Sequence, residues 1–255
     1  MHRFAHRTSV RAAVLAAGLL AGTGAIAGCG GGTTTTAAPV QPGTTASMFQ
    51  TPMAGLQQQF ERVVQIVSPQ VVQIQGSLGL GSGVVFDDQA DVVTNAHVVA
   101  GEKKFVVTLS SGGQHPATLV GADKAHDLAV VHISGARPAA ATFGDSSIAK
   151  VGDLVLAIGN PLGLRSSVTQ GIVSSLGRAV SEGNGVTLSP AIQTSAAINP
   201  GNSGGALADL TGSVIGIPTL AALDPQLGGG QAAGIGFAIP SNTVRQVATG
   251  LIAGH

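Results

Sequence analysis

Short runs rich in Val and Ile recur along most of this chain, separated by turn residues such as Gly, Asp, Ser and Asn. Runs of this length and composition are typical of β-strands. No long apolar pattern with helical spacing alternates with them, which argues against a parallel sheet covered by helices. The twelve runs are VVQIQG, GSGVVF, DVVTNA, KFVVTLS, ATLVGA, DLAVVHI, LVLAIG, SVTQGIVSSLG, AIQTSA, GGALAD, SVIGIPT and GIGFAIP.

The runs divide into two groups of six, with a looser stretch near residues 134–152 between them. A sheet exposes unpaired edges unless it closes on itself. We therefore predict an all-β protein with two closed or nearly closed units, the first at about 69–134 and the second at about 153–240.

One helix is expected before the strands and one after them. Thr51 followed by Pro52 is typical of a helix start, and Ser241 is placed to cap a C-terminal helix over 241–254. The apolar face of the first helix would consist of Leu56, Phe60, Val63, Val64 and Ile66. That of the second would consist of Val244, Val247 and Leu251.

The first 28 residues predict a secretory signal peptide that does not belong to the fold. Their first eleven residues include three arginines, and an apolar stretch follows from about residue 12 to 27. This stretch is short for a membrane-spanning helix, and glycines interrupt it. Residues 29–52 are rich in Gly, Thr and Pro and carry no charge, so we expect a flexible tether there, followed by a folded domain over 53–255.

Cys29 is the only cysteine of the chain, so an intramolecular disulfide is excluded. With Ile26, Ala27 and Gly28 it resembles the lipobox of bacterial lipoproteins, in which this cysteine is lipidated after cleavage. We favour an exported protein anchored in the membrane of the cell envelope through Cys29. The alternative is cleavage after Ala27, which would leave a secreted protein with a free thiol.

The charge pattern gives no sign of a nucleic-acid partner. Twelve basic residues balance twelve acidic ones, and no basic run is longer than Lys103 and Lys104. Three histidines, His115, His126 and His132, lack the spacing of metal ligands. We expect neither a metal nor an organic cofactor.

Ser203 lies in the glycine-rich segment NPGNSGGAL. A serine hydroxyl attacks a carbonyl when a base takes its proton and backbone donors receive the oxyanion. The pattern G-x-S-x-G also describes the nucleophile elbow of α/β-hydrolases, which need a histidine after the serine. The only histidine after Ser203 is His255, the last residue, so that interpretation fails.

Suitable partners precede Ser203. His97 in TNAHVV ends a predicted strand, and Asp127 in HDLAVV enters an apolar one. Alone, His97 could be structural, and Asp127 could cap a turn, as we expect of Asp123. Together they give the chain order His, Asp, Ser, which is that of chymotrypsin.

From about Phe60 to Val244 the chain resembles the protease domain of HtrA/Deg-type serine proteases, within the chymotrypsin-fold class. The resemblance implies two six-stranded antiparallel β-barrels with the active site between them. It rests on the segments VSPQVVQI, GSGVVF, TNAHVV, DLAVV, AIGNPLG, SVTQGIVSSLGR, IQTSAAINPGNSGGAL and GIGFAIPSNTV.

Carried over by position, the resemblance makes Ser203 the nucleophile, His97 the general base and then acid, and Asp127 the residue that orients the imidazole. The N–H groups of Gly201 and Ser203 would form the oxyanion hole. Ser203 would come from the second barrel and the other two triad residues from the first.

The resemblance also places a specificity pocket at Ala197 and Ile198. Residues Ile217 to Thr219 would offer a strand edge to an extended peptide. A pocket without a carboxylate favours small or medium aliphatic side chains over Arg or Lys.

Asn202 stands where digestive relatives have an aspartate that pairs with a newly formed N-terminus. A neutral side chain cannot form that ion pair, so we expect another input, such as substrate or oligomer contacts, to order the loop. The resemblance makes a homotrimer a candidate assembly. Because the sequence ends just after the expected terminal helix, we also expect the protein to lack the PDZ domain of many relatives.

The sequence thus predicts an exported, lipid-anchored serine endopeptidase that hydrolyses unfolded or exposed polypeptides. One alternative is a chaperone-like protein that binds peptides on the same fold with little turnover. A general esterase is a further alternative, which the peptide-like strand edge disfavours.

Overall fold

The computed structural model describes residues 50–254, except 78, 161–166, 182–186, 200 and 225–229. The predicted signal peptide, most of the predicted tether and Cys29 lie outside the described residues. Among the helices that are described, none is both long and apolar enough to cross a membrane.

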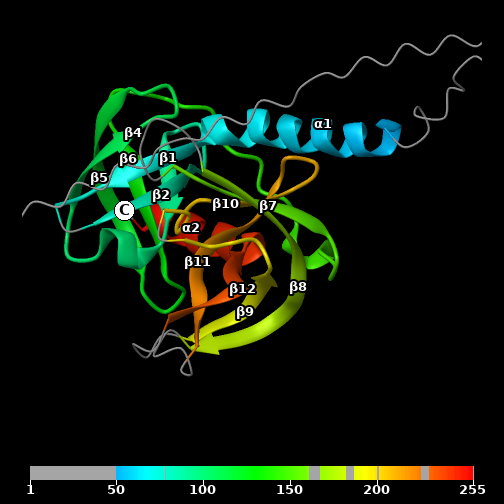
Figure 1. The fold of residues 1–255 in the computed structure, drawn as a ribbon. Coiled ribbons are helices and arrows are strands. Elements are labelled where there is room, and N and C mark those ends of the chain that lie inside the picture. The colour runs from blue at the N-terminus through cyan, green and yellow to red at the C-terminus, as the bar shows by residue number, and fades with distance from the viewer. Residues whose placement is uncertain are drawn as a thin grey trace, which may run out of the picture. The chain divides into compact units, whose positions relative to one another are not determined.

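The first six strands close into an antiparallel barrel, in the order β1-β2-β3-β6-β5-β4 (Figure 1). Neighbouring strands are antiparallel throughout this barrel. The strands are β1 (Val71–Gln75), β2 (Leu80–Val85), β3 (Asp91–Thr94), β4 (Lys104–Thr108), β5 (Gln114–Asp123) and β6 (Leu128–Ile133).

The last six strands form a second closed barrel, in the order β10-β11-β12-β9-β8-β7. Each of the twelve predicted runs overlaps one of the twelve strands, so the prediction of an all-β fold with two six-stranded barrels is confirmed. The strands are β7 (Leu154–Gly159), β8 (Ser167–Ser181), β9 (Thr187–Thr194), β10 (Ala206–Asp209), β11 (Val214–Asp224) and β12 (Gly230–Pro240).

Strands β2, β3 and β6 of the first barrel are buried on both faces, because one face fills the barrel and the other packs against a shared core. Neighbours in β3 show this division: Val92 belongs to the interior of the barrel, and Val93 to a cluster that also contains Leu156 and Ile158 of β7. All four side chains are 2% exposed or less. Strands buried on both faces read as continuous apolar runs, which is the pattern seen in the sequence.

Helix α1 (Gln50–Val67) contacts β7 and β10. Val63 and Val67 are fully buried, and Phe60 and Val64 pack against the same cluster. The prediction that Ile66 belongs to the buried face is wrong, since its side chain is 39% exposed.

Helix α2 (Ser241–Ala253) packs Val244 and Ala248 into the shared core. The prediction that Ser241 caps this helix is wrong. Its hydroxyl donates instead to the carbonyl oxygen of Gly144, at 2.7 Å, in the segment between the barrels. The adjacent Asp145 accepts hydrogen bonds from Ser147 and from Asn242 of α2, and these bonds lower the pKa of its carboxyl to about 2.

The barrels meet closely at Gly204, just before β10. Its backbone has φ +79°, and a Cβ atom there would lie 2.2 Å from the carbonyl oxygen of Ser82 and 2.5 Å from Oγ1 of Thr94. Both of those residues belong to the first barrel. Only glycine satisfies the backbone angle and the close approach together.

Gly204→Ala should therefore lower the free energy of unfolding by about 2–5 kcal/mol, since left-handed strain adds to a clash with backbone. Gly135→Ala is the matched control, because Gly135 has φ +78° but a Cβ atom there would meet nothing within 4 Å. It should lose only about 1–2 kcal/mol. Denaturant unfolding measures both, and equal losses would contradict the close approach.

Candidate active site

A tight turn between β5 and β6 delivers Asp127. The carboxylate of Asp123 accepts hydrogen bonds from the N–H groups of Ala125 (2.9 Å) and His126 (3.2 Å), and it lies 2.7 Å from Nδ1 of His126. Burial raises the pKa of Asp123, but these bonds outweigh burial, so the net pKa lies below its usual value. The prediction that Asp123 caps a turn is confirmed. Asp127 itself has φ +50°, a strained angle that Asp tolerates better than most residues.

Hydrogen bonds from two elements hold the carboxylate of Asp127. Asp127 is only 3% exposed. Its Oδ1 accepts from the backbone N–H of His97 at 3.0 Å, and its Oδ2 lies 2.9 Å from Nδ1 of the His97 ring. Oδ2 also accepts from Oγ1 of Thr219 at 2.6 Å. A buried carboxylate needs such partners, because burial without them would be costly.

These contacts also determine the state of the His97 ring. A carboxylate can only accept hydrogen bonds, so Nδ1 of His97 carries a proton that points at Asp127. In the neutral ring Nε2 is then the acceptor. The side chain of His97 is 45% exposed, which leaves the ring within reach of a reacting molecule.

His97 lies in the short helix η2 (Ala96–Val99), whereas the sequence analysis placed it at the end of a strand. The backbone of Asp127 holds the start of this helix. Its carbonyl oxygen accepts from the N–H of Ala96 and from the side-chain amide of Asn95, both at 3.1 Å. Asp127 therefore positions η2 through its main chain and the imidazole through its side chain.

Ser203 approaches from the turn before β10 and is 7% exposed. Its hydroxyl donates to the carbonyl oxygen of Thr219 at 2.9 Å. Thr219 thus contacts Ser203 through its main chain and Asp127 through its hydroxyl. It joins the three predicted triad residues into one network that spans both barrels.

The sequence predicts Thr219 in the strand edge that would bind the substrate, and it gives no sign of the bond from Thr219 to Asp127. Thr219 has no exposed surface, and its hydroxyl is committed to the carboxylate. Nothing in the run SVIGIPT indicates that the hydroxyl of this threonine forms a specific hydrogen bond. The contact is seen only in the folded structure.

The other predicted pocket residues differ in exposure. Ala197 is exposed, while Ile198 is 4% exposed and packs in the core of the second barrel. Ile217 is fully buried. The carbonyl oxygen of Ala197 accepts from Oγ1 of Thr169 (2.8 Å) and from the side-chain amide of Asn202 (3.2 Å), so this segment is tied to the loop that carries Ser203.

Asn202 is 1% exposed, and its side-chain amide donates to the carbonyl oxygen of Ala197. An aspartate at this buried position would need a cation beside it. The neutral side chain therefore suits a loop that is held by hydrogen bonds between uncharged groups.

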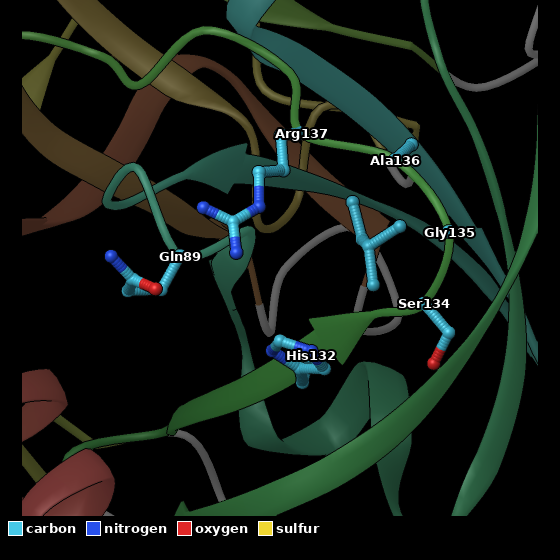
Figure 2. Close-up of a pocket in the computed structure, with 7 residues that line it drawn as sticks. Gln89, His132, Ser134, Gly135, Ala136 and Arg137 are labelled. Carbon is cyan, nitrogen blue, oxygen red and sulfur yellow. The ribbon is translucent and has the colours of Figure 1, made fainter.

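A separate pocket of about 530 Å³ lies at the C-terminal end of β6, whereas Asp127 precedes the N-terminal end of this strand (Figure 2). None of the predicted triad residues lines this pocket. Gln89, His132 and Arg137 line it. Nδ1 of His132 lies 2.9 Å from Oδ1 of the buried Asp91, so an Asp–His pair also lies at this pocket, outside the candidate site. In the described ranges no group of three or more His, Cys, Asp or Glu residues is placed to hold a metal ion.

Comparison with known proteins gives a consistent family. Residues 81–217 match the trypsin-like peptidase domain. The periplasmic serine endoprotease DegP of Escherichia coli (strain K12) is 47% identical over 182 residues, which cover 71% of this chain and 37% of that protein. The serine protease PepD of Mycobacterium tuberculosis is 43% identical over 218 residues, which cover 75% of this chain and 46% of that protein.

Solved structures agree. The HtrA-type protease AlgW with a tripeptide superimposes with a TM-score of 0.68 and 40% identity, over 76% of this chain and 63% of that chain. The present chain spans less than half the length of DegP and of PepD. More than half of it matches the peptidase domain. The chain therefore belongs to the trypsin-like peptidase family, with HtrA-type serine proteases among its relatives.

Proposed function

We propose that this chain is a serine endopeptidase that hydrolyses peptide bonds through an acyl-enzyme formed on Ser203. The observation that carries the proposal is the buried Asp127 carboxylate, which binds the His97 ring at 2.9 Å and Thr219 at 2.6 Å. Thr219 in turn accepts from the Ser203 hydroxyl at 2.9 Å. A buried carboxylate, an imidazole and a serine joined in this way have the composition of a nucleophilic triad.

In the proposed reaction Nε2 of His97 takes the Ser203 proton while Oγ attacks the substrate carbonyl carbon. The imidazolium then gives this proton to the leaving amine, and the carbon–nitrogen bond breaks to leave an acyl-enzyme. Water, activated by the same ring, attacks the ester and releases the acid. Asp127 holds the ring in the required tautomer and stabilises its positive charge.

The oxyanion of the tetrahedral intermediate would be bound by the N–H groups of Gly201 and Ser203. Among the described residues neither group has a hydrogen-bond acceptor, which supports this assignment. A donor of this kind is typically worth about 100-fold to 1,000-fold in rate. Gly201 has no side chain to obstruct the approach.

An extended polypeptide is the substrate class that suits the fold. β11 pairs with β10 at Val214 and Gly216 and then continues beside β12. Beyond Thr219, the strand partners described for β11 all lie on β12. We propose that the other edge of β11 accepts a peptide as an added strand. We expect small or medium aliphatic side chains such as Val, Ala or Ile to be preferred at the pocket formed by Ala197 and Ile198.

We place this activity outside the cytoplasm, on the lipid anchor predicted at Cys29, because the N-terminal sequence resembles that of exported lipoproteins. DegP, one relative, is named as periplasmic. The chaperone-like alternative uses the same strand edge without turnover, and it does not need a bonded histidine beside the serine.

Treatment of the purified protein with a fluorophosphonate should modify Ser203, and mass spectrometry should locate the adduct. Ser203→Ala should abolish labelling and peptide cleavage while leaving the fold intact. His97→Ala should also lose labelling, because the base is gone.

His132→Ala is the matched control for His97→Ala, since His132 binds a buried aspartate at the same 2.9 Å and its side chain has the same 45% exposure. It should label at the wild-type rate. An unlabelled wild-type protein that still binds unfolded polypeptide would favour the chaperone-like alternative.

Cleavage of a fluorogenic peptide should fall as the pH is lowered from about 8 to about 5. A protonated imidazole cannot accept the serine proton, and imidazole groups titrate in this interval. The far-ultraviolet circular dichroism should be unchanged over the same range. An equal rate at both ends would rule out a histidine base.

Cys29→Ala should release the protein from the membrane fraction of expressing cells into the soluble fraction, because the lipid-bearing atom is lost. Mass spectrometry of the wild-type N-terminus should show a lipidated Cys29. An unmodified N-terminus at Gly28 would instead support cleavage after Ala27.

A further inference from the structure

We propose that Ser82, in β2 of the first barrel, is a positioning residue that holds the oxyanion loop (residues 201–205) in its productive arrangement. The proposal rests on the proposed function, because it assigns a role in the same reaction. It also answers what orders this loop when Asn202 carries no charge.

Ser82 binds the loop at two carbonyl groups that flank Asn202. Its hydroxyl donates to the carbonyl oxygen of Gly201 at 2.6 Å, and its backbone N–H donates to the carbonyl oxygen of Ser203 at 3.0 Å. The hydroxyl also accepts from the N–H of Asn160, at 2.8 Å, at the end of β7. Ser82 is fully buried, so no water competes for these positions.

Three N–H groups of the loop are bound from within the second barrel. The N–H of Asn202 donates to Asn199, that of Gly205 donates to the carbonyl of Asn202, and that of Gly204 donates to Pro218, at 2.8, 2.9 and 2.9 Å. Between residues 201 and 205, the two N–H groups with no hydrogen bond to a described residue are therefore those of Gly201 and Ser203, the predicted oxyanion donors.

The peptide unit between Gly201 and Asn202 is consequently held at both ends, by Ser82 on its oxygen and by Asn199 on its N–H. This matters because glycine rotates more freely than any other residue. Without the Ser82 hydroxyl, rotation about Gly201 could carry its N–H away from the substrate oxyanion. Removing the hydroxyl would also leave the Gly201 carbonyl and the Asn160 N–H without this partner.

Closeness to Gly159 limits the other side of the loop. A Cβ atom on Gly159 would lie 2.5 Å from the carbonyl oxygen of Gly201 and 2.7 Å from Oδ1 of Asn202. The loop is thus confined between β7 and the Ser82 hydroxyl. None of these contacts involves a charged group, so a neutral Asn202 is sufficient.

Ser82→Ala should lower the rate of fluorophosphonate labelling of Ser203, and kcat on a fluorogenic peptide with Val at the cleavage position, by roughly 10-fold to 100-fold. This is less than the loss of a whole oxyanion donor, because the N–H is displaced and not removed. KM should change by less than about threefold, since the donors act in the transition state.

Ser241→Ala separates positioning from general destabilisation. Ser241, the first residue of α2, is also fully buried, and its hydroxyl also donates to a backbone carbonyl at 2.7 Å. The acceptor is Gly144, in the segment between the barrels. It should lower the thermal midpoint without slowing labelling. If Ser82→Ala does not fold, Ser82→Cys keeps the volume with a weak donor, and its labelling should be slower than that of the wild type.

A folded Ser82→Ala variant, or failing that Ser82→Cys, that labels at the wild-type rate would overturn the role of Ser82 while leaving the protease proposal intact. A wild-type protein that does not label at Ser203 would instead overturn the proposed function and this inference together. A fall in labelling equal to that of Ser241→Ala would show a structural role only, which also contradicts the proposal.

Discussion

The carboxylate of Asp127 is the group on which the site depends. This acidic group is almost completely buried, and it accepts hydrogen bonds from donors in two separate parts of the chain. The helix η2 supplies the backbone N–H and ring Nδ1 of His97, while β11 supplies the Thr219 hydroxyl. A buried carboxylate without hydrogen-bond donors would destabilise the folded protein. The Asp127 carboxylate therefore favours the conformation in which His97 and Thr219 both donate to it.

This arrangement makes the two barrels interdependent. Thr219 crosses from the second barrel to Asp127, and Ser82 crosses from the first barrel to the loop that carries Ser203. The contacts run in opposite directions, so each barrel positions a residue of the other. The shared apolar core behind them, which includes Val93, Leu156 and Ile158, brings the surfaces close enough for hydrogen bonds to form.

Much of the fold could be predicted from the sequence because local composition determines it. Val and Ile runs gave all twelve strands, since β-branched residues and regular turns leave few alternatives. The chain order predicted His97, Asp127 and Ser203 as site residues. In the structure His97 and Asp127 are in contact, and Thr219 connects Asp127 to Ser203 by hydrogen bonds.

Contacts between distant segments could not be predicted in this way. Ser241 looked like a cap because only its neighbours were visible, whereas its hydroxyl bonds to Gly144, 97 residues earlier. Thr219 and Ser82 resemble ordinary strand residues, and their partners lie 92 and 119 residues away. The exposure of Ile66 likewise depends on which part of α1 meets the barrel.

The crossing contacts have a consequence for the life of the newly made chain. With only the first barrel formed, a chain has the residues proposed as acid and base but lacks Ser203, and Thr219 is absent from Asp127. With only the second, Ser203 lies on a loop that lacks its bonds to Ser82. Under the proposed mechanism, hydrolysis therefore requires both barrels to be folded and docked, so a chain with one barrel formed would be inactive and could not digest its neighbours.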